Sequence, residues 1–384
     1  MTTSSPDERA ARAALSVLVE PGTPAAEQVA REVLAAGPAA ALAAIRTGSG
    51  PLDPDRRMFR RAPDVDGAAV LERGVAVGAR FCCPGDAEWP VGLDTLEVTL
   101  DSSSRYGPPP LGLWIRGDTN LAGATDRSVA VVGSRAATDY GMRVAADLSA
   151  DLAAAGWTVV SGAAYGIDAA AHRGALAVGG TTVAVLACGV DTAYPTGHGG
   201  LLHRVAETGI VVSELPPGSR PSRLRFLARN RLIAAMTRGT VVVEAAVRSG
   251  ALNTAGWALD IGREILAVPG PVTSAMSAGC HNLVRKGVAS LVTDAREVID
   301  IVGELGKDAA VETCGEPRPW DDLAPTTRDV LEALPARNAV SVDRICRDTG
   351  LEASACIAAL AELSIAGLVS SGPDGWRLAR RGGA

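Results

Sequence analysis

The stretch of sequence that decides the fold is Val159-Val-Ser-Gly-Ala-Ala-Tyr-Gly-Ile-Asp-Ala-Ala-Ala-His172. An apolar strand runs into a Ser-Gly turn, and an alanine-rich helix leaves that turn at Gly166. Backbone N–H groups at the start of such a helix are unpaired, and the helix dipole adds positive potential there. An anion, most often a phosphate, is the usual ligand of this geometry. A plain strand-to-helix turn capped by Asp168 explains the same residues equally well.

The sequence around this stretch alternates between strand-like and helix-like segments. The strand-like runs are short, apolar and carry β-branched residues. Mostly apolar strands that alternate with helices predict a parallel sheet covered by helices on both faces. We therefore expect an α/β domain over residues 126–305. Its predicted strands are 129–132, 157–160, 182–187, 210–212, 241–243 and 265–268.

The remaining sequence predicts smaller parts on either side of this domain. Residues 1–60 are alanine-rich with apolar residues at helical spacing and predict a small helical domain. Residues 61–125, broken by Gly and Pro, predict a connecting segment packed on the core, and the polar residues 306–322 predict a linker. Residues 323–384 predict three helices followed by a hairpin, which is the order of a winged helix. The third helix, 352–366, has no Lys or Arg, so a protein contact or a structural role is favoured over the recognition of duplex DNA.

Composition excludes several classes of protein. The chain has 384 residues, of which 47% are hydrophobic and 21% charged, as expected for a soluble protein of about two or three domains. A net charge of -6 leaves room for only a local basic patch as a nucleic-acid site. The seven cysteines form no CxxC pair and predict reduced thiols in a cytoplasmic protein. Four scattered histidines predict no metal site, and no apolar run is long enough to predict a membrane span.

A second turn, Gly133-Ser134-Arg135, follows the first predicted strand of the α/β domain. Gly133 permits a close backbone turn, and the hydroxyl and guanidinium groups beside it suit phosphate oxygens. The turn lacks the GxGxxG pattern, and the second strand ends in Ser161 where an NAD-binding protein has an acid. We therefore predict no dinucleotide cofactor. A surface arginine beside a tight turn is the alternative interpretation of Arg135.

A third turn, 249–254, again joins a strand to a helix. The loops that follow parallel strands gather at the carboxyl edge of the sheet, so the three turns are expected to face one crevice. An ordinary strand-to-helix loop remains the alternative for this turn taken alone. The candidate phosphate-binding residues of the three turns are Gly133, Ser134, Arg135, Ser161, Gly162, Gly166, Ile167, Asp168, Ser249, Gly250 and Thr254.

An arginine-rich segment, 216–240, carries six arginines and no acid. Such segregation in an acidic chain indicates a polyanionic partner. Phe226 lies among these arginines and could stack on an unpaired base. A phenylalanine in such a position is more often a core residue, and a solvated charged face is the alternative for the arginines.

Taken together, the motifs over 125–295 resemble those of the bacterial DNA-processing protein A (DprA/Smf) family. The motifs are GSR at 133, SGAAYGID at 161 with His172, AYP at 193, SE at 213, ARNR at 228, VVEAAVRSGALNTA at 242 and AVPG at 267. The resemblance implies a Rossmann-like sheet in a homodimeric protein without catalytic residues or cofactors. It also implies binding of single-stranded DNA, protection of incoming strands and their transfer to the RecA recombinase during natural transformation.

The resemblance also assigns residues to a DNA groove. It places there Arg135, the turn from Ser161 to Asp168, the turn from Ser249 to Thr254, and the residues Arg229, Asn230 and Arg231. The sequence departs from the family pattern after the Tyr-Pro motif, where a basic residue is common and this chain has Thr196. A phosphate contact is therefore lost there or taken over by Arg204 or another arginine.

Two other functions stay open at this level. The fold also resembles phosphoribohydrolases, whose PGGxGTxxE loop supplies a carboxylate to the glycosidic bond. Aligning the threonine of that loop with Thr254 puts Trp257 at the position of the glutamate, so most of the loop is missing. Asp168 could act as a base, but its place at a helix start predicts a structural role. A pure interaction scaffold that uses the winged helix is the third possibility.

Overall fold

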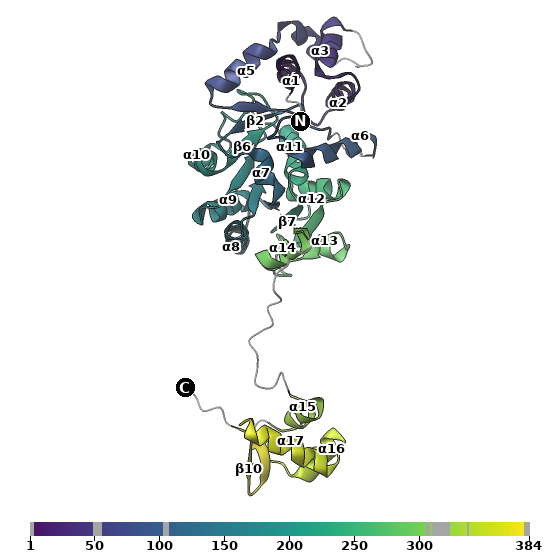
Figure 1. Ribbon diagram of the computed structural model, residues 1–384, viewed down its shortest axis with the longest axis vertical. Coiled ribbons are helices and arrows are strands. Elements are labelled where there is room, and N and C mark those ends of the chain that lie inside the picture. The colour runs from purple at the N-terminus through teal and green to yellow at the C-terminus, as the bar shows by residue number, and fades with distance from the viewer. Residues whose placement is uncertain are drawn as a thin grey trace. The chain divides into compact units, whose positions relative to one another are not determined.

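The computed structural model describes residues 4–48, 56–102, 107–304, 308, 323–335 and 338–379. Contacts divide the chain into two compact units, Met1–Ala310 and Val311–Ala384. Figure 1 shows the first unit as a central sheet with helices on both sides and the second as a small group of helices with a hairpin. Within the described residues, no helix is both long and apolar enough to cross a membrane.

The described residues of the first unit form a nine-stranded sheet with the order β1-β2-β6-β5-β4-β3-β7-β8-β9. The strands from β3 to β9 run parallel, whereas β2 is antiparallel to both β1 and β6. All six predicted strands are present, which confirms the predicted α/β class. β1, β2 and β9 are not among the predicted strands, and they have only three, four and two residues. The bounds are β1 Arg80–Cys82, β2 Leu113–Arg116, β3 Ser128–Val132, β4 Thr158–Ser161, β5 Thr182–Val185, β6 Ile210–Ser213, β7 Gly239–Val242, β8 Glu264–Ala267 and β9 Ser290–Leu291.

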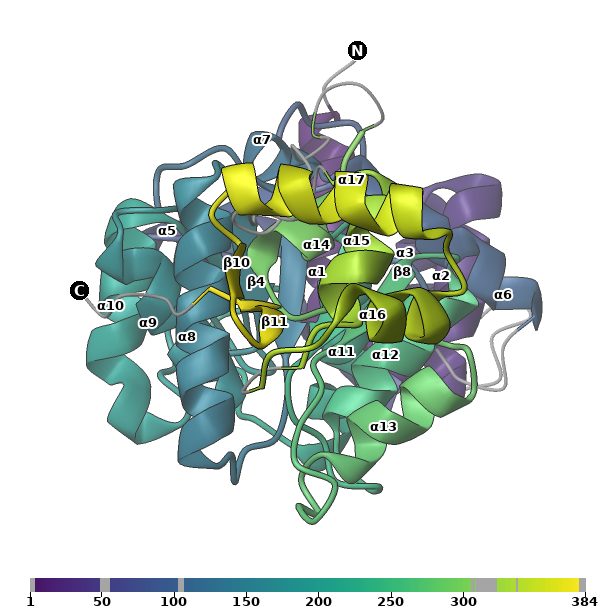
Figure 2. The same cartoon turned by 90° about the horizontal axis from the view of Figure 1, so that it is seen from below.

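Helices cover both faces of this sheet, so its central strands are buried at every position. α8, α9 and α10 lie on one face, and α11, α12 and α13 lie on the other (Figures 1 and 2). Thr138 begins α8, because its hydroxyl accepts a hydrogen bond from the N–H of Gly141 at 3.2 Å. The bounds are α8 Asp139–Ala154, α9 Ile167–Ala177, η3 Thr196–His198, α10 Gly199–Thr208, α11 Arg223–Ala235, α12 Ala251–Asp260, α13 Ala278–Arg285 and α14 Ala295–Val302.

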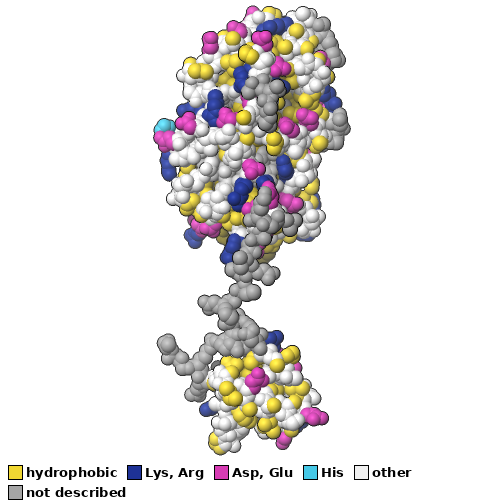
Figure 3. Space-filling model, in the orientation of Figure 1, with side chains coloured by type: hydrophobic (Ala, Val, Ile, Leu, Met, Phe, Trp, Pro, Cys, Tyr) yellow, Lys and Arg dark blue, Asp and Glu magenta, His cyan; other side chains and the backbone are white. Residues whose placement is uncertain are grey.

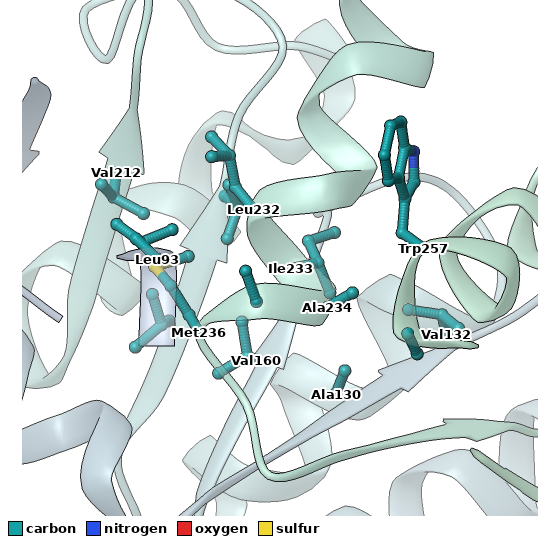
Figure 4. Packing of buried hydrophobic residues seen from close by; sticks show 14 of the residues in the cluster. Leu93, Ala130, Val132, Val160, Val212, Leu232, Ile233, Ala234, Met236 and Trp257 are labelled. Carbon is teal, nitrogen blue, oxygen red and sulfur yellow. The ribbon is translucent and has the colours of Figure 1, made fainter. Parts of the chain in front are cut away.

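The core beneath α11 fixes this helix against the sheet. Leu232, Ile233 and Ala234 of α11 pack towards Val132 of β3, and Trp257 of α12 joins the same cluster (Figure 4). Burial of this many apolar side chains is the main favourable term that holds the helix in place. The residues of α11 that precede Leu232 are therefore held at the edge of the sheet where strands β3 and β7 end.

The N-terminal helices form a cluster of their own that is tied to α11. Ser5 and Glu8 make a reciprocal capping box at the start of α1, and Thr23 caps α2. The carboxylate of Glu20 accepts two hydrogen bonds from Arg225 of α11, at 2.6 and 2.7 Å. The bounds are α1 Pro6–Leu18, α2 Pro24–Ala36, α3 Pro38–Thr47, α4 Arg56–Arg61, η1 Ala62–Asp64, α5 Gly67–Ala76, η2 Val91–Val98, α6 Thr99–Ser102 and α7 Leu121–Asp126.

The second unit has the three helices and the hairpin that the sequence predicts. Val330, Ile345 and Leu360 form the centre of its separate core. Most of the predicted linker 306–322 lies outside the described residues, but Asp308 pairs with Arg127 of the first unit at 2.6 Å. The bounds are α15 Pro325–Glu332, α16 Val342–Thr349, α17 Ala353–Ile365, β10 Val369–Gly372 and β11 Gly375–Leu378.

Candidate nucleic-acid interface

A pocket of about 830 Å³ opens at the carboxyl ends of β3, β4 and β7. The chain builds β4, β5 and β6 on one side of β3 and then crosses to β7 on the other side. Ligands of open α/β sheets bind at such a reversal of strand order, outside the carboxyl ends of the strands. Residues from all three predicted turns line the pocket, together with residues of α11. The prediction that these turns face one crevice is therefore confirmed. We call this cavity the switch-point pocket.

The turns around the switch-point pocket are built against one another. The N–H of Ser134 donates to the carbonyl of Glu244 at 2.7 Å, and the N–H of Ile167 donates to the carbonyl of Ser134 at 3.2 Å. Gly166 has a φ of +76°, and a Cβ on it would lie 2.3 Å from the Ser134 carbonyl oxygen. A Cβ on Gly133 would lie 2.5 Å from the side chain of Ile167. Both glycines are therefore needed for this close approach.

The floor of the pocket holds a buried positive charge. The side chain of Arg229 is only 4% exposed, and its Nη1 donates to the carbonyl of Val185 at 2.5 Å. The Nε of Arg229 has no hydrogen-bond partner among the described residues. Burial, with a contribution from Arg135, lowers the pKa of Arg229 to about 10, while the charge of Asp168 acts in the opposite direction. An anion in the pocket would offset part of this unfavourable burial.

The candidate residues of the turn from Ser161 to Asp168 differ in their exposure to the pocket. Asp168 lines it, and its carboxylate accepts a hydrogen bond from the N–H of Ala164 at 3.3 Å. Burial raises the pKa of Asp168. The N-cap of α9 is Gly166, so the prediction that Asp168 caps the helix is wrong.

Ser161, Gly162 and Ile167 lie beneath the switch-point pocket and do not line it. Ser161 is fully buried, and its hydroxyl donates to the carbonyl of Val131 at 2.7 Å. Gly162 packs on Arg229, because a Cβ at that position would lie 1.9 Å from the Nη1 of the arginine. These residues therefore support the pocket floor.

A cluster of three contacting side chains forms one wall of the pocket. The guanidinium carbon of Arg135 lies 4.6 Å from the ring centroid of Phe226, and the centroids of Tyr194 and Phe226 are 5.5 Å apart. Phe226 is half-buried and lines the pocket, so its interpretation as a core residue is wrong. The arginine and Tyr194 are exposed. This aromatic cluster therefore offers aromatic surface and a positive charge to a ligand together.

Arg231 is not part of the pocket, in contrast to the expectation. The side chain is 1% exposed, and it donates two hydrogen bonds to the carboxylate of Glu214 at 2.7 and 2.6 Å. Its Nε donates to the carbonyl of Pro108 at 2.8 Å. Residues 229 and 231 are two positions apart and therefore lie on different faces of α11. One arginine of the motif faces the pocket and the other faces the interior of the protein. Arg231 therefore joins α11 to Glu214 at the end of β6 and to the segment that contains Pro108.

Other arginines of the acid-free segment are also paired with carboxylates from distant parts of the chain. Arg225 pairs with Glu20, and Arg238 pairs with Glu304 at 2.9 Å and with Asp126 at 3.5 Å. In the folded protein, distant acids therefore compensate part of the positive charge that the sequence of this segment carries. Figure 3 shows acidic and basic side chains interspersed over one face of the first unit.

Two exposed arginines that the sequence analysis does not select line the switch-point pocket. Arg223 begins α11, and Arg248 lies in the turn after β7. Neither they nor Arg135 make an ion pair with a described residue. The position of Arg248 inside the VRSG motif is a signal that could have identified it. Thr196 is exposed and lies outside the residues that line the pocket, as does Arg204.

The third turn lies on the side of the pocket formed by α12. Ser249, Gly250 and Thr254 all line the pocket. Asn230 lines it as well, and its amide donates to the side-chain oxygen of Asn253 at 3.2 Å, which joins α11 to α12. Gly250 is the N-cap of α12 and supplies no side-chain cap. The N–H of Ala251 donates to the hydroxyl of Ser249 at 3.3 Å, and the N–H groups of the next two residues donate to backbone carbonyls of this turn, so the helix start is closed by its own loop.

Two family models match the chain. The model described as DNA recombination-mediator protein A matches residues 80–303, and the DprA winged helix domain matches residues 315–375. The chain belongs to the DNA-processing protein A (DprA/Smf) family. The first match contains the whole switch-point pocket, so the pocket belongs to the part of the chain that defines the family.

Relatives named for DNA processing extend this match over most of the chain. The Putative DNA processing protein DprA of Mycobacterium tuberculosis is 47% identical, over 94% of this chain and 92% of that protein. Protein Smf of Escherichia coli is 35% identical, over 73% of this chain and 77% of that protein. The X-ray structure of DprA from Streptococcus pneumoniae is similar with a TM-score of 0.64 and 29% identity, covering 79% of this chain and all of that one.

Proposed function

We propose that this protein binds single-stranded DNA in the switch-point pocket and delivers it to the RecA recombinase. The single observation that carries the proposal is the cluster of Arg135, Phe226 and Tyr194 on the pocket wall. An aromatic face inside a pocket can stack on an unpaired base, whereas the bases of a duplex are stacked on each other. The description of the family as a recombination mediator supports the transfer to RecA.

The remaining groups of the pocket fit the sugar-phosphate backbone. Arg135, Arg223 and Arg248 stand at its opening, and the buried charge of Arg229 lies at its floor. Phosphate contacts of this kind release counterions, so the affinity falls as salt rises. They carry no information about sequence, and we expect little preference among bases.

We propose that the protein holds the strand without cutting it. Asp168 is the carboxylate that lines the pocket among the described residues, and it is already hydrogen-bonded to the turn before α9. Trp257, at the position of the phosphoribohydrolase glutamate, is 3% exposed and belongs to the core. Incubation with nucleoside monophosphates should release no free base, and any turnover would restore the enzyme hypothesis.

The cellular setting follows from the resemblance to the family. We propose a cytoplasmic homodimer that protects incoming strands in natural transformation. Light scattering of the purified protein measures the dimer directly, and protection of a labelled strand from a nuclease measures the second activity. Formation of RecA filaments on a strand coated with single-strand binding protein, with and without this protein, tests delivery to the recombinase.

The central experiment is a titration of labelled single-stranded and double-stranded oligonucleotides at several salt concentrations. We expect tighter binding to the single strand and a steep loss of affinity with salt. Binding that is independent of salt, or that is stronger to the duplex, would contradict the proposal.

A further inference from the structure

A second cavity, of about 1060 Å³, lies between the N-terminal helices and the loop that joins β6 to α11. Residues 216–220 of this loop line the second cavity, and residues 221–223 line the switch-point pocket. The two cavities therefore adjoin across one short loop. Here the second one is called the N-terminal groove.

The N-terminal groove carries positive charge. Exposed Arg61, Arg73 and Arg220 line it, from α4, α5 and the loop before α11, and none pairs with a described carboxylate. Glu20 also lines the groove, but both of its carboxylate oxygens accept hydrogen bonds from Arg225. That pair is neutral as a unit, so the three remaining charges are not compensated within the groove.

Contacts between the N-terminal region and α11 fix the shape of the groove. The Glu20–Arg225 pair joins the N-terminal helices to α11, and a Cβ on Gly22 would lie 3.0 Å from the Cβ of Ala228 on the same helix. Between the charged groups the lining contains apolar surface from Val17, Met58 and a proline-rich loop, beside polar residues such as Thr23 and Gln28. Bases can lie on such apolar surface while their phosphates face the arginines.

We propose that the N-terminal groove holds the continuation of the bound DNA strand. The strand would leave the switch-point pocket at Arg223, pass Arg220 and follow the groove along the N-terminal helices. This inference rests on the proposed function, because it extends the site for the same ligand. The shared loop favours a continuous nucleic-acid strand over an acidic peptide, since one chain of phosphates can use the arginines of both cavities.

The test compares short and long oligonucleotides on the full-length protein. We expect the variant Arg61→Ala/Arg73→Ala/Arg220→Ala to bind thymidine oligomers of about 5 nucleotides like the natural protein, because these fill one cavity. Oligomers of about 20 nucleotides should bind about tenfold more weakly, with a salt slope smaller by about 2, as three lost phosphate contacts predict. Fluorescence anisotropy at several salt concentrations measures both quantities.

A matched control removes three exposed arginines that line neither cavity. They are Arg60, Arg173 and Arg285, and their replacement by Ala should leave both oligomers unaffected. The Arg61 side chain donates to the carbonyl of Val17 at 3.1 Å, so the triple variant could lose stability. The double variant Arg73→Ala/Arg220→Ala removes no hydrogen bond between described side chains and keeps the test valid in that case.

Three results would overturn the inference. They are unchanged binding of the long oligomer, an equal loss for both oligomers, and an equal loss in the control variant. Loss of binding to an acidic protein without any effect on long oligomers would assign the groove to that class of partner. If the natural protein binds no single strand at low salt, the proposed function fails together with the inference. If it binds and only the length effect is missing, the inference alone fails.

Discussion

Two helices of equal length show how differently the two units treat charge. α11 and α17 each have thirteen residues. α11 carries four arginines, of which Arg223 and Arg229 line the switch-point pocket and Arg225 and Arg231 pair with acids. α17 carries no Lys or Arg and leaves Ile357 exposed. The arginines of one helix can therefore serve both ligand binding and internal structure. The positions of acidic residues elsewhere in the fold decide which arginines form internal ion pairs and which remain available to a ligand.

The largest expected effect is a loss of stability when the buried ion pair of Arg231 and Glu214 is broken. Arg231→Ala would leave the carboxylate of Glu214 buried and without its partner. Breaking one side of a buried pair costs about 3–5 kcal/mol. Urea unfolding should show a loss of this size in the first unit. The double variant Arg231→Met/Glu214→Leu should recover much of it, because neither charge is then buried alone. A single variant of unchanged stability would show that Arg231 is not structural.

The two units should also respond differently to acid. His172 is fully buried beneath the pocket, its Nδ1 contacts the hydroxyl of Thr182 at 2.7 Å, and burial lowers the pKa of His172 to about 3. An unfolded histidine has a pKa of about 6.5, so below that value the unfolded state binds the proton and the folded state does not. The stability of the first unit should therefore fall by about 2 kcal/mol by pH 5.

The second unit contains no histidine and supplies the control for this pH dependence. Calorimetry between pH 7 and pH 5 should show a shift in the transition of the first unit and little change in the second. His172→Gln should flatten the slope of the first transition over this range. Parallel shifts of both transitions would assign the acid sensitivity to other groups.

A smaller effect is expected at the aromatic wall of the pocket. Phe226→Ala removes the ring that contacts Arg135 and Tyr194 and should weaken binding of a single strand by about 1–3 kcal/mol, the usual contribution of one stacked base. Phe226→Trp keeps an aromatic face and should bind nearly as well as the natural protein. Anisotropy titrations with one oligonucleotide compare the two. Equal affinities of the Ala and Trp variants would remove the stacking role.

The sequence predicts the backbone of the site better than its side chains. Short apolar strands and the glycines at 133 and 166 identify the sheet and the turns, because parallel strands must be apolar and tight turns need glycine. The side chains depend on distant partners that no local pattern contains. Arg231 is internal because Glu214 is buried next to it, and the charge of Arg225 is compensated because Glu20 of the N-terminal region pairs with it. Phe226 is at the pocket because α11 places its apolar residues 232–234, and not this ring, against the sheet.

The smallest expected effect concerns α17, and it tests the other half of the comparison. Ala358 is exposed on this helix, and Ala358→Glu adds a negative charge to the face that a winged helix would insert into a DNA groove. We expect the affinity for single-stranded and double-stranded oligonucleotides to change by less than about twofold, because an exposed charge away from the phosphates is screened within about 10 Å at 0.1 M salt. The matched variant Arg248→Glu, in the switch-point pocket, should reduce binding of the single strand strongly. A clear loss of duplex binding in Ala358→Glu would show instead that α17 contacts DNA despite its lack of basic side chains.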